Sequence, residues 1–157
     1  MPYKNGDSLF FKEIETDSIS IVVVTDYSER VADDLVYPEN CPDNCAEAIE
    51  VQFKRVKGTS IYFPQNYFVQ KCDEVIVASG SAGPDYDYCE ETNPFFYFDK
   101  RASSYINSLE IAGKTYYNVY EYTTLVTSYN IKKLYVAKGY GIVRVVQDDG
   151  MYDLIHK

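Results

Sequence analysis

The sequence predicts an all-β protein, an antiparallel meander of about ten short strands with little helix. In most of the short apolar segments, apolar residues recur at every second position, which is the period of a strand. Gly, Asp and Pro residues separate these segments at turn spacings. No stretch keeps a helical period over three turns, and no linker rich in Pro or Ser divides the chain. We therefore expect a single domain over residues 1–157, whose sheet forms a curled sheet, a barrel or a sandwich.

The N-terminal half contains the less regular part of this pattern. Residues 9–14 and 18–25 predict a hairpin, because the four residues from Glu15 to Ser18 supply turn chemistry between them. Breaker residues predict an irregular segment over 26–47, with room for one helical turn at 29–35. Further strands are predicted at 48–56, 60–63, 67–70 and 74–78.

The C-terminal third carries the clearest strand signal. After a loop at 80–93 and an aromatic strand at 94–98, strands are predicted at 105–111, 114–124, 131–137, 140–146 and 151–155. Gly113, Gly139 and the Asp149-Gly150 pair mark hairpin turns between them. Within 114–124, strict alternation predicts one face made of Tyr116, Asn118, Tyr120 and Tyr122 and an opposite face made of Tyr117, Val119 and Glu121.

Composition limits the partners. The net charge of −9 repels phosphate backbones and anionic lipid surfaces, so neither a nucleic acid nor a membrane surface is an expected partner. The chain has 17 Tyr, 8 Phe and no Trp. Tyrosine favours strands and tolerates half-buried positions, so these residues are expected along sheet faces and strand ends. A tyrosine-lined groove for a sugar or a peptide is the alternative interpretation.

Neither a membrane span nor a leader is visible in the sequence. No run of about 18 apolar residues occurs. The first seven residues are polar and lack the apolar stretch of a signal peptide. The protein is therefore expected either to be cytoplasmic or to be a mature form whose leader has been removed, and the cysteines bear on that choice.

Four cysteines, Cys41, Cys45, Cys72 and Cys89, favour disulfides and hence an oxidising compartment. We favour the pairs Cys41–Cys45 and Cys72–Cys89, while the crossed pairings stay open. A four-cysteine zinc site and free buried thiols are the alternatives, although the spacings do not match paired C-x2-C knuckles. The expected location is extracytoplasmic: periplasmic, anchored to the outer membrane, or secreted.

Three segments, SLEIAGKTYYNVY at 108–120, LYVAKGYGIVR at 134–144 and PYKNGDSLFF at 2–11, carry a resemblance. They resemble secreted proteins and lipoproteins of Bacteroidetes-type bacteria that have no assigned activity. The resemblance implies an envelope location, with Gly113 and Gly139 as turn glycines and Val119, Leu134 and Val143 as core positions. Membrane attachment could occur only through a lipid anchor, whose cysteine motif this chain lacks.

No catalytic motif and no cofactor motif stands out. The only histidine, His156, lies next to the last residue, where a rigidly oriented catalytic base is not expected. Two acidic groups could hold Ca²⁺ or could be solvated loop charges; they are Asp85, Asp87, Glu90 and Glu91, and the turn Asp148-Asp149-Gly150. Neither group matches a known calcium loop, so we expect no metal site and no cofactor.

The functional hypothesis is a non-enzymatic cell-envelope or secreted protein that binds an unknown small molecule or protein through its β surface. A lipid-carrier version requires a large apolar cavity, and a filled core would count against it. The alternatives are a protein–protein interaction module, which requires an exposed aromatic patch, and a carboxylate-dependent hydrolase.

Overall fold

Eleven β-strands form one antiparallel sheet in the computed structural model, which describes residues 3–31, 47–58, 61, 66–70, 75–79, 97–98, 103–123 and 130–157. All regular elements in these residues are strands. Their bounds are β1 Ser8–Glu13, β2 Ile19–Val31, β3 Glu47–Lys57, β4 Asn66–Gln70, β5 Val75–Ser79, β6 Tyr97–Phe98, β7 Ser103–Ile111, β8 Lys114–Thr123, β9 Ile131–Ala137, β10 Gly141–Gln147 and β11 Met151–His156. The all-β prediction is confirmed, with eleven strands where about ten were predicted.

The first and last strands are neighbours in the middle of the sheet. The order is β6-β5-β4-β3-β2-β1-β11-β10-β9-β8-β7, and each neighbouring pair is antiparallel. Strands that follow each other in sequence are therefore paired, except for β6 and β7 at the two ends. An even number of antiparallel steps separates these two, so they run in the same direction and cannot form a hairpin. The described strands form an open meander rather than a closed barrel.

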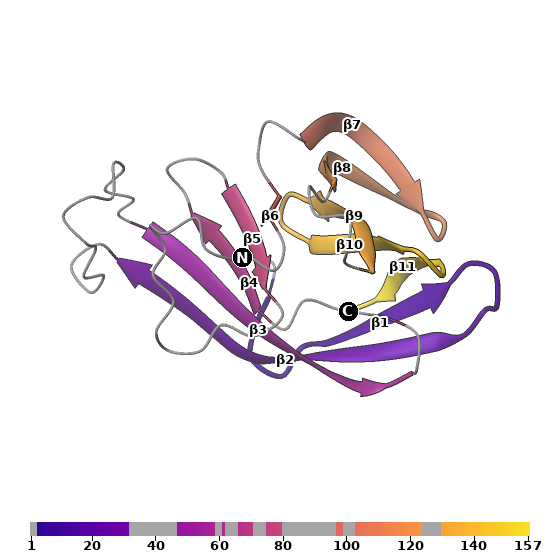
Figure 1. The fold of residues 1–157 in the computed structure, drawn as a ribbon, viewed down its shortest axis with the longest axis horizontal. Coiled ribbons are helices and arrows are strands. Elements are labelled where there is room, and N and C mark those ends of the chain that lie inside the picture. The colour runs from indigo at the N-terminus through magenta and orange to yellow at the C-terminus, as the bar shows by residue number, and fades with distance from the viewer. Residues whose placement is uncertain are drawn as a thin grey trace.

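The sheet curls strongly on the side of the last five strands. Strands β7 and β11 contact each other although β8, β9 and β10 lie between them in the hydrogen-bonded order. Figure 1 shows β4 and β5 on one side of the molecule and β7 to β10 on the other. The long strands β2 and β3 run from the first side toward β1 and β11. This curl brings the tips of the C-terminal hairpins toward the N-terminal segment.

The prediction of an irregular segment from residue 26 is wrong for its first six residues. Strand β2 continues through Asp26 to Val31, paired with the start of β3, so no helical turn begins at Glu29. The register shifts between Val24 and Asp26, which places a bulge at the expected breaker. A bulge absorbs one extra residue without ending the strand, whereas the propensity of Asp alone suggests a stop. Of the strand predicted at 60–63, only Ile61 is described, and it lies outside any strand.

The predicted hairpins of the C-terminal third are confirmed. Gly113 and Gly139 both have positive φ, at 77° and 78°. Ala112 precedes Gly113 with φ of 50°, so both central residues of the β7–β8 turn are left-handed, as tight hairpin turns require. The β10–β11 turn closes through a hydrogen bond from Gln147 N to Gly150 O of 2.8 Å.

Strict alternation fails in the middle of β8. Tyr116, Val119 and Tyr122 are the buried positions, so burial follows a spacing of three instead of two. Asn118 adopts φ of 53°, a left-handed conformation that asparagine tolerates better than most residues. This kink turns Val119 to the face that Tyr116 occupies. The predicted separation of Val119 from the face of Tyr116 is therefore wrong. Tyr120 and Tyr122, which were predicted on one face, do lie side by side, with stacked ring centroids 6.3 Å apart.

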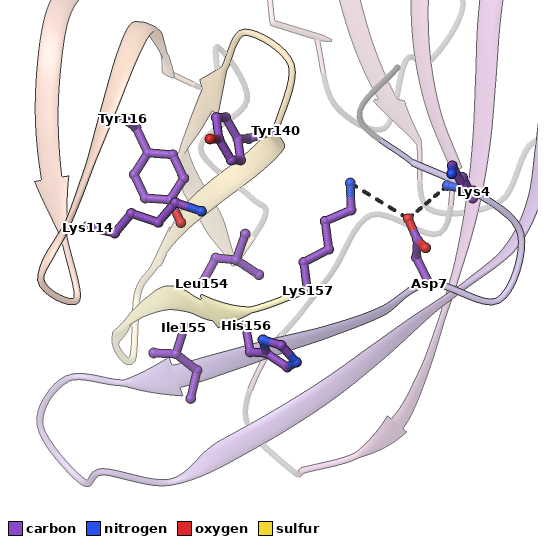
Figure 2. Close-up of a pocket in the computed structure, with 9 residues that line it drawn as sticks. All are labelled: Lys4, Asp7, Lys114, Tyr116, Tyr140, Leu154, Ile155, His156 and Lys157. Atoms are coloured by element: carbon purple, nitrogen blue, oxygen red, sulfur yellow. Dashed lines mark hydrogen bonds and ion pairs between the residues drawn. The ribbon is translucent and has the colours of Figure 1, made fainter.

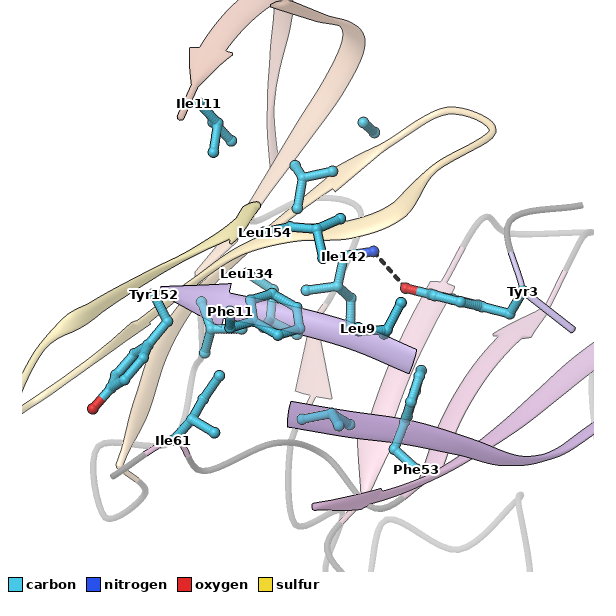
Figure 3. Packing of buried hydrophobic residues seen from close by; sticks show 14 of the residues in the cluster. Tyr3, Leu9, Phe11, Phe53, Ile61, Ile111, Leu134, Ile142, Tyr152 and Leu154 are labelled. Carbon is cyan, nitrogen blue, oxygen red and sulfur yellow. Dashed lines mark hydrogen bonds between the residues drawn. The ribbon is translucent and has the colours of Figure 1, made fainter. Parts of the chain in front are cut away.

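The concave side of the sheet is filled by side chains. Leu9, Phe11 and Val22 from the N-terminal strands pack with Leu134, Ile142, Val145 and Tyr152 from the C-terminal ones, and each is fully buried (Figure 3). The three positions that the resemblance marks as core, Val119, Leu134 and Val143, are all buried.

Tyr3 closes one end of this cluster. Its ring packs edge-to-face on Phe53 with 5.2 Å between centroids. Its hydroxyl oxygen accepts a hydrogen bond of 2.6 Å from the backbone N–H of Ile142, a contact drawn in Figure 3. Gly141 leaves room for the ring, because a Cβ at this position would lie 2.1 Å from the tyrosine oxygen. The segment before β1 is thereby tied to β10.

Candidate anion-binding pocket

A pocket of about 420 Å³ opens where three parts of the chain meet. The segment before β1 supplies Lys4 and Asp7, and the C-terminal end of β11 supplies residues from Leu154 to His156 together with Lys157. The turns at the tips of the β7–β8 and β9–β10 hairpins bring Lys114, Tyr116 and Tyr140 (Figure 2). We call this site the lysine pocket.

Three lysines from three separate segments face the pocket. Figure 2 shows Lys157 between Lys114 on one side and Asp7 with Lys4 on the other. Asp7 is the one acidic side chain in the lining. The pocket thus concentrates positive charge on a protein whose net charge is −9. Such a local excess attracts an anion even when the remainder of the surface repels it.

Lys114 is held over two aromatic rings. Its Nζ lies 4.3 Å from the centroid of Tyr140 and 5.0 Å from that of Tyr116. The two rings pack edge-to-face with their centroids 5.1 Å apart. Cation–π attraction fixes the ammonium without neutralising its charge, so Lys114 stays available to an anionic ligand. Burial raises the pKa of Tyr116, with smaller contributions from Tyr140 and Asp153, so its hydroxyl is a neutral donor at physiological pH.

Lys157 is positioned from two sides. Its Nζ lies 4.8 Å from the ring centroid of Tyr3 and 3.7 Å from Oδ2 of Asp7. The same Oδ2 accepts a hydrogen bond of 2.8 Å from the backbone N–H of Lys4. Burial lowers the pKa of Lys157; Asp7 acts in the opposite direction, and the nearby charges of Lys4 and Lys114 lower the pKa further. An anion between the three ammonium groups would relieve their mutual repulsion.

The remaining lining residues are mostly apolar. Leu154 is buried at the base of the pocket, and Tyr140 is 41% exposed beside Lys114. Ile155 is 40% exposed, and its side chain points away from the lysines on the other side of β11 (Figure 2). The His156 ring lies against Phe10 with 5.5 Å between centroids. The pocket therefore offers charged donors on its sides and apolar surface at its base and rim.

A second polar cluster crosses β8 to β11 on the sheet. Arg144 donates two hydrogen bonds to the carboxylate of Asp153, at 2.5 and 2.9 Å, and lies 5.7 Å from the ring centroid of Tyr135. Lys133 pairs with Glu121 at 2.6 Å. The hydrogen bond from Lys133 holds the pKa of Glu121 below its usual range, and burial together with Glu121 raises the pKa of Tyr135 to about 12. The charges of this polar cluster are paired across neighbouring strands, so we interpret the cluster as stabilising strand register.

The structure places the sequence-predicted candidates as follows. Cys41, Cys45, Cys72 and Cys89 all lie outside the described residues, as does the acidic group from Asp85 to Glu91. In the turn at Asp148, the carboxylate forms an ion pair with Lys132 at 3.2 Å. Among the residues with defined positions, no group of three or more His, Cys, Asp or Glu side chains could hold a metal ion.

His156, considered above only as a catalytic base, is part of the lysine pocket. In the part of the chain that the structure describes, no helix has the length and apolarity that crossing a bilayer demands.

Sequence reasoning missed the three lysines of the pocket. Lys4 and Lys157 lie at opposite ends of the chain, and Lys114 follows a turn, where a solvated charge is the ordinary expectation. They meet because β1 pairs with β11 and because the sheet curls. Tyr140 beside a turn glycine was the only local signal, since an aromatic residue at a hairpin tip is often half-exposed.

Comparison of the chain with protein-family models, with curated proteins and with solved structures finds no match.

Proposed function

We propose that this protein is a non-enzymatic binding protein that holds an anionic small molecule in the lysine pocket. The single observation that carries the proposal is the presence of three lysines in the lining of one cavity of about 420 Å³. This volume lies within the range of small-molecule sites, which is about 300–1,000 Å³. A ligand of that size could contact all three segments that form the pocket.

The charge balance of the pocket supports an anion rather than a cation. Among the side chains of the lining, three ammonium groups and one carboxylate leave an excess of positive charge. Lys4 and Lys114 have no carboxylate partner among the residues that the structure describes, and the one carboxylate near Lys157 is 3.7 Å away. An anion that contacts Lys4 and Lys114 would therefore break no ion pair among these described residues, which keeps the cost of binding low.

The filled concave face argues against the lipid-carrier version of the hypothesis. Large side chains such as Tyr3, Phe11 and Tyr152 occupy the interior of the described sheet. A carrier of fatty acyl chains requires an apolar cavity there. The lysine pocket lies at the end of this core and is lined by charged groups, so it suits a compact polar ligand better than an acyl chain.

We further propose that the protein acts outside the cytoplasm, in the periplasm, on the outer membrane or after secretion. The support is the even number of cysteines, 4 in 157 residues. Non-reducing peptide mapping tests this proposal directly. Linked peptides that contain Cys41–Cys45 and Cys72–Cys89 are expected, and four thiols that alkylate freely would contradict it.

The binding proposal is tested by NMR titration of the protein with sodium sulfate and with inorganic phosphate at low ionic strength. Amide shifts are expected to concentrate at Lys4, Lys114 and Lys157 and to weaken as salt is added. Replacing Lys114 with Gln should weaken sulfate binding about tenfold, which corresponds to about 1.4 kcal/mol of charge-assisted hydrogen bonding. Lys54→Gln, a change of an exposed lysine on β3, is the matched control and should leave binding unchanged.

Shifts scattered over all lysines, or equal losses from Lys114→Gln and Lys54→Gln, would show non-specific charge attraction in place of a site.

A further inference from the structure

We infer that the ligand of the lysine pocket is a sugar ring that carries one anionic group, either a carboxylate or a sulfate. This inference rests on the proposed function and specifies its ligand class. It depends on three features of the pocket: the carboxylate among the lysines, the half-exposed aromatic ring at the rim, and the size of the cavity.

Asp7 is the feature that a simple anion site lacks. Its carboxylate lies inside the basic pocket and repels any second negative charge that comes close. Both of its contacts, from Lys4 N and Lys157 Nζ, are made to Oδ2, and Oδ1 has no partner among the described residues. A carboxylate oxygen can accept hydrogen bonds from hydroxyl groups. A ligand that brings hydroxyl donors together with its negative charge turns this repulsion into a favourable contact.

The position of Lys114 separates the two parts of such a ligand. Figure 2 shows the Lys114 ammonium beside Tyr140, across the pocket from Asp7. An anionic group placed near Lys114 would lie away from the Asp7 carboxylate, and the ring hydroxyls would then face Asp7. Charge and hydroxyl groups on opposite edges of one compact ring match this arrangement.

The apolar residues favour a ring over a bare ion. Tyr140 exposes 41% of its surface beside Lys114, and Leu154 lies at the base. Sulfate or phosphate alone would leave this apolar surface in water. The C–H face of a sugar ring can pack on this apolar surface. Half-exposed tyrosine rings are common at recognition sites, where they offer such a surface. A cavity of about 420 Å³ also exceeds what a small inorganic ion fills.

Isothermal titration calorimetry of the full chain tests the inference with defined probes. Sodium glucuronate and glucose 6-sulfate represent the two forms of the ligand, glucose tests the ring without charge, and sodium acetate and sodium sulfate test the charge without the ring. We expect the two acidic sugars, or one of them, to bind at least about tenfold more tightly than glucose, acetate and sulfate. Whichever acidic sugar binds more tightly identifies the anionic group.

The Asp7→Asn variant separates the role of the carboxylate from that of the lysines. It removes one negative charge, so sulfate should bind more tightly to the variant than to the parent protein. The affinity of the acidic sugar should rise less than that of sulfate, or fall, because the variant lacks the charged group that accepts hydrogen bonds from the sugar hydroxyls. The ratio of sugar affinity to sulfate affinity should therefore fall. Asp17→Asn, a change of an exposed carboxylate that pairs with Lys12 away from the pocket, is the matched control and should leave this ratio unchanged.

Each outcome decides one proposal. If acetate and sulfate bind as tightly as the acidic sugars, with shifts at the three pocket lysines, the sugar inference is overturned while anion binding stands. If no anionic probe binds, both proposals are overturned. If the acidic sugars bind more tightly but Asp7→Asn leaves their preference over sulfate intact, the role assigned to Asp7 is overturned, and with it the argument for hydroxyl donors.

Discussion

Tyr3→Phe is the sharpest perturbation of the contact that ties the N-terminal segment to β10. The change keeps the ring that packs on Phe53 and carries the Lys157 ammonium, and it removes only the hydroxyl oxygen. That oxygen is the acceptor for the N–H of Ile142, at 2.6 Å and fully buried. The variant therefore removes this hydrogen bond while the ring stays in place.

The magnitude follows from the burial of both partners. A buried donor that is left without an acceptor costs about 1–3 kcal/mol. The space left by one oxygen atom is too small for a water molecule that must also find several polar partners, so solvent does not restore the bond. In a domain of this size, each kcal/mol lowers the melting temperature by about 2–4 °C, which gives a decrease of roughly 2–12 °C.

Urea unfolding followed by far-UV circular dichroism measures the effect, and a thermal melt provides an independent value. Tyr117→Phe is the matched control, because Tyr117 is 65% exposed and its hydroxyl is in water. The control should change the free energy of unfolding by less than about 0.5 kcal/mol. If Tyr3→Phe changes the free energy of unfolding as little as the control does, the Tyr3 hydroxyl does not hold the N-terminal segment to β10. The position of Lys4 beside the pocket would then lose its support.

Three further predictions concern the sheet. Arg144→Met leaves the Asp153 carboxylate, which is 9% exposed, without its partner. The free energy of unfolding in urea should fall by up to about 3 kcal/mol. A loss below about 0.5 kcal/mol would show that solvent screens the pair fully. Asn118→Val forces a β-branched residue into φ of 53° and should destabilise by about 1–3 kcal/mol more than Asn118→Gly. Both variants lose the exposed hydrogen bond from the Tyr105 hydroxyl to Asn118 Oδ1, so equal effects would contradict the kink. The pKa of Tyr135 is raised to about 12, so the folded state keeps a proton that the unfolded state releases near pH 10. The contribution of Tyr135 to stability is complete below about pH 10 and is lost as the pH rises through 12. The free energy of unfolding of Tyr135→Phe should therefore depend less on alkaline pH than that of the parent protein. The same dependence on pH in both proteins would refute the raised pKa of Tyr135.

The local parts of the fold could be predicted, and the non-local parts could not. The turns at Gly113 and Gly139 and the strands beside them depend on neighbours in sequence, so propensity and alternation suffice. The continuation of β2 to Val31 depends on pairing with the start of β3, which overrides the breaker at Asp26 through a bulge. The kink at Asn118 was hidden because asparagine fits both a strand edge and a left-handed position.

The candidate site lies beyond sequence reasoning for a related reason. The register that sets Phe10 opposite His156 brings the two ends of the chain together, and no local pattern encodes it. Lys4, Lys114 and Lys157 therefore look like isolated surface charges in the sequence. Asp7 likewise resembles a turn residue until its Oδ2 is seen between Lys4 and Lys157. The chemistry of the pocket arises from the fold rather than from a motif.

A crystal structure of the protein grown with sodium glucuronate or glucose 6-sulfate would test the central claim most directly. The account predicts density for the sugar in the lysine pocket, with its anionic group in contact with the Lys114 ammonium and at least one hydroxyl donating to Asp7. An empty pocket in crystals that hold either sugar elsewhere, or a sugar bound with its charged group against Asp7, would contradict it.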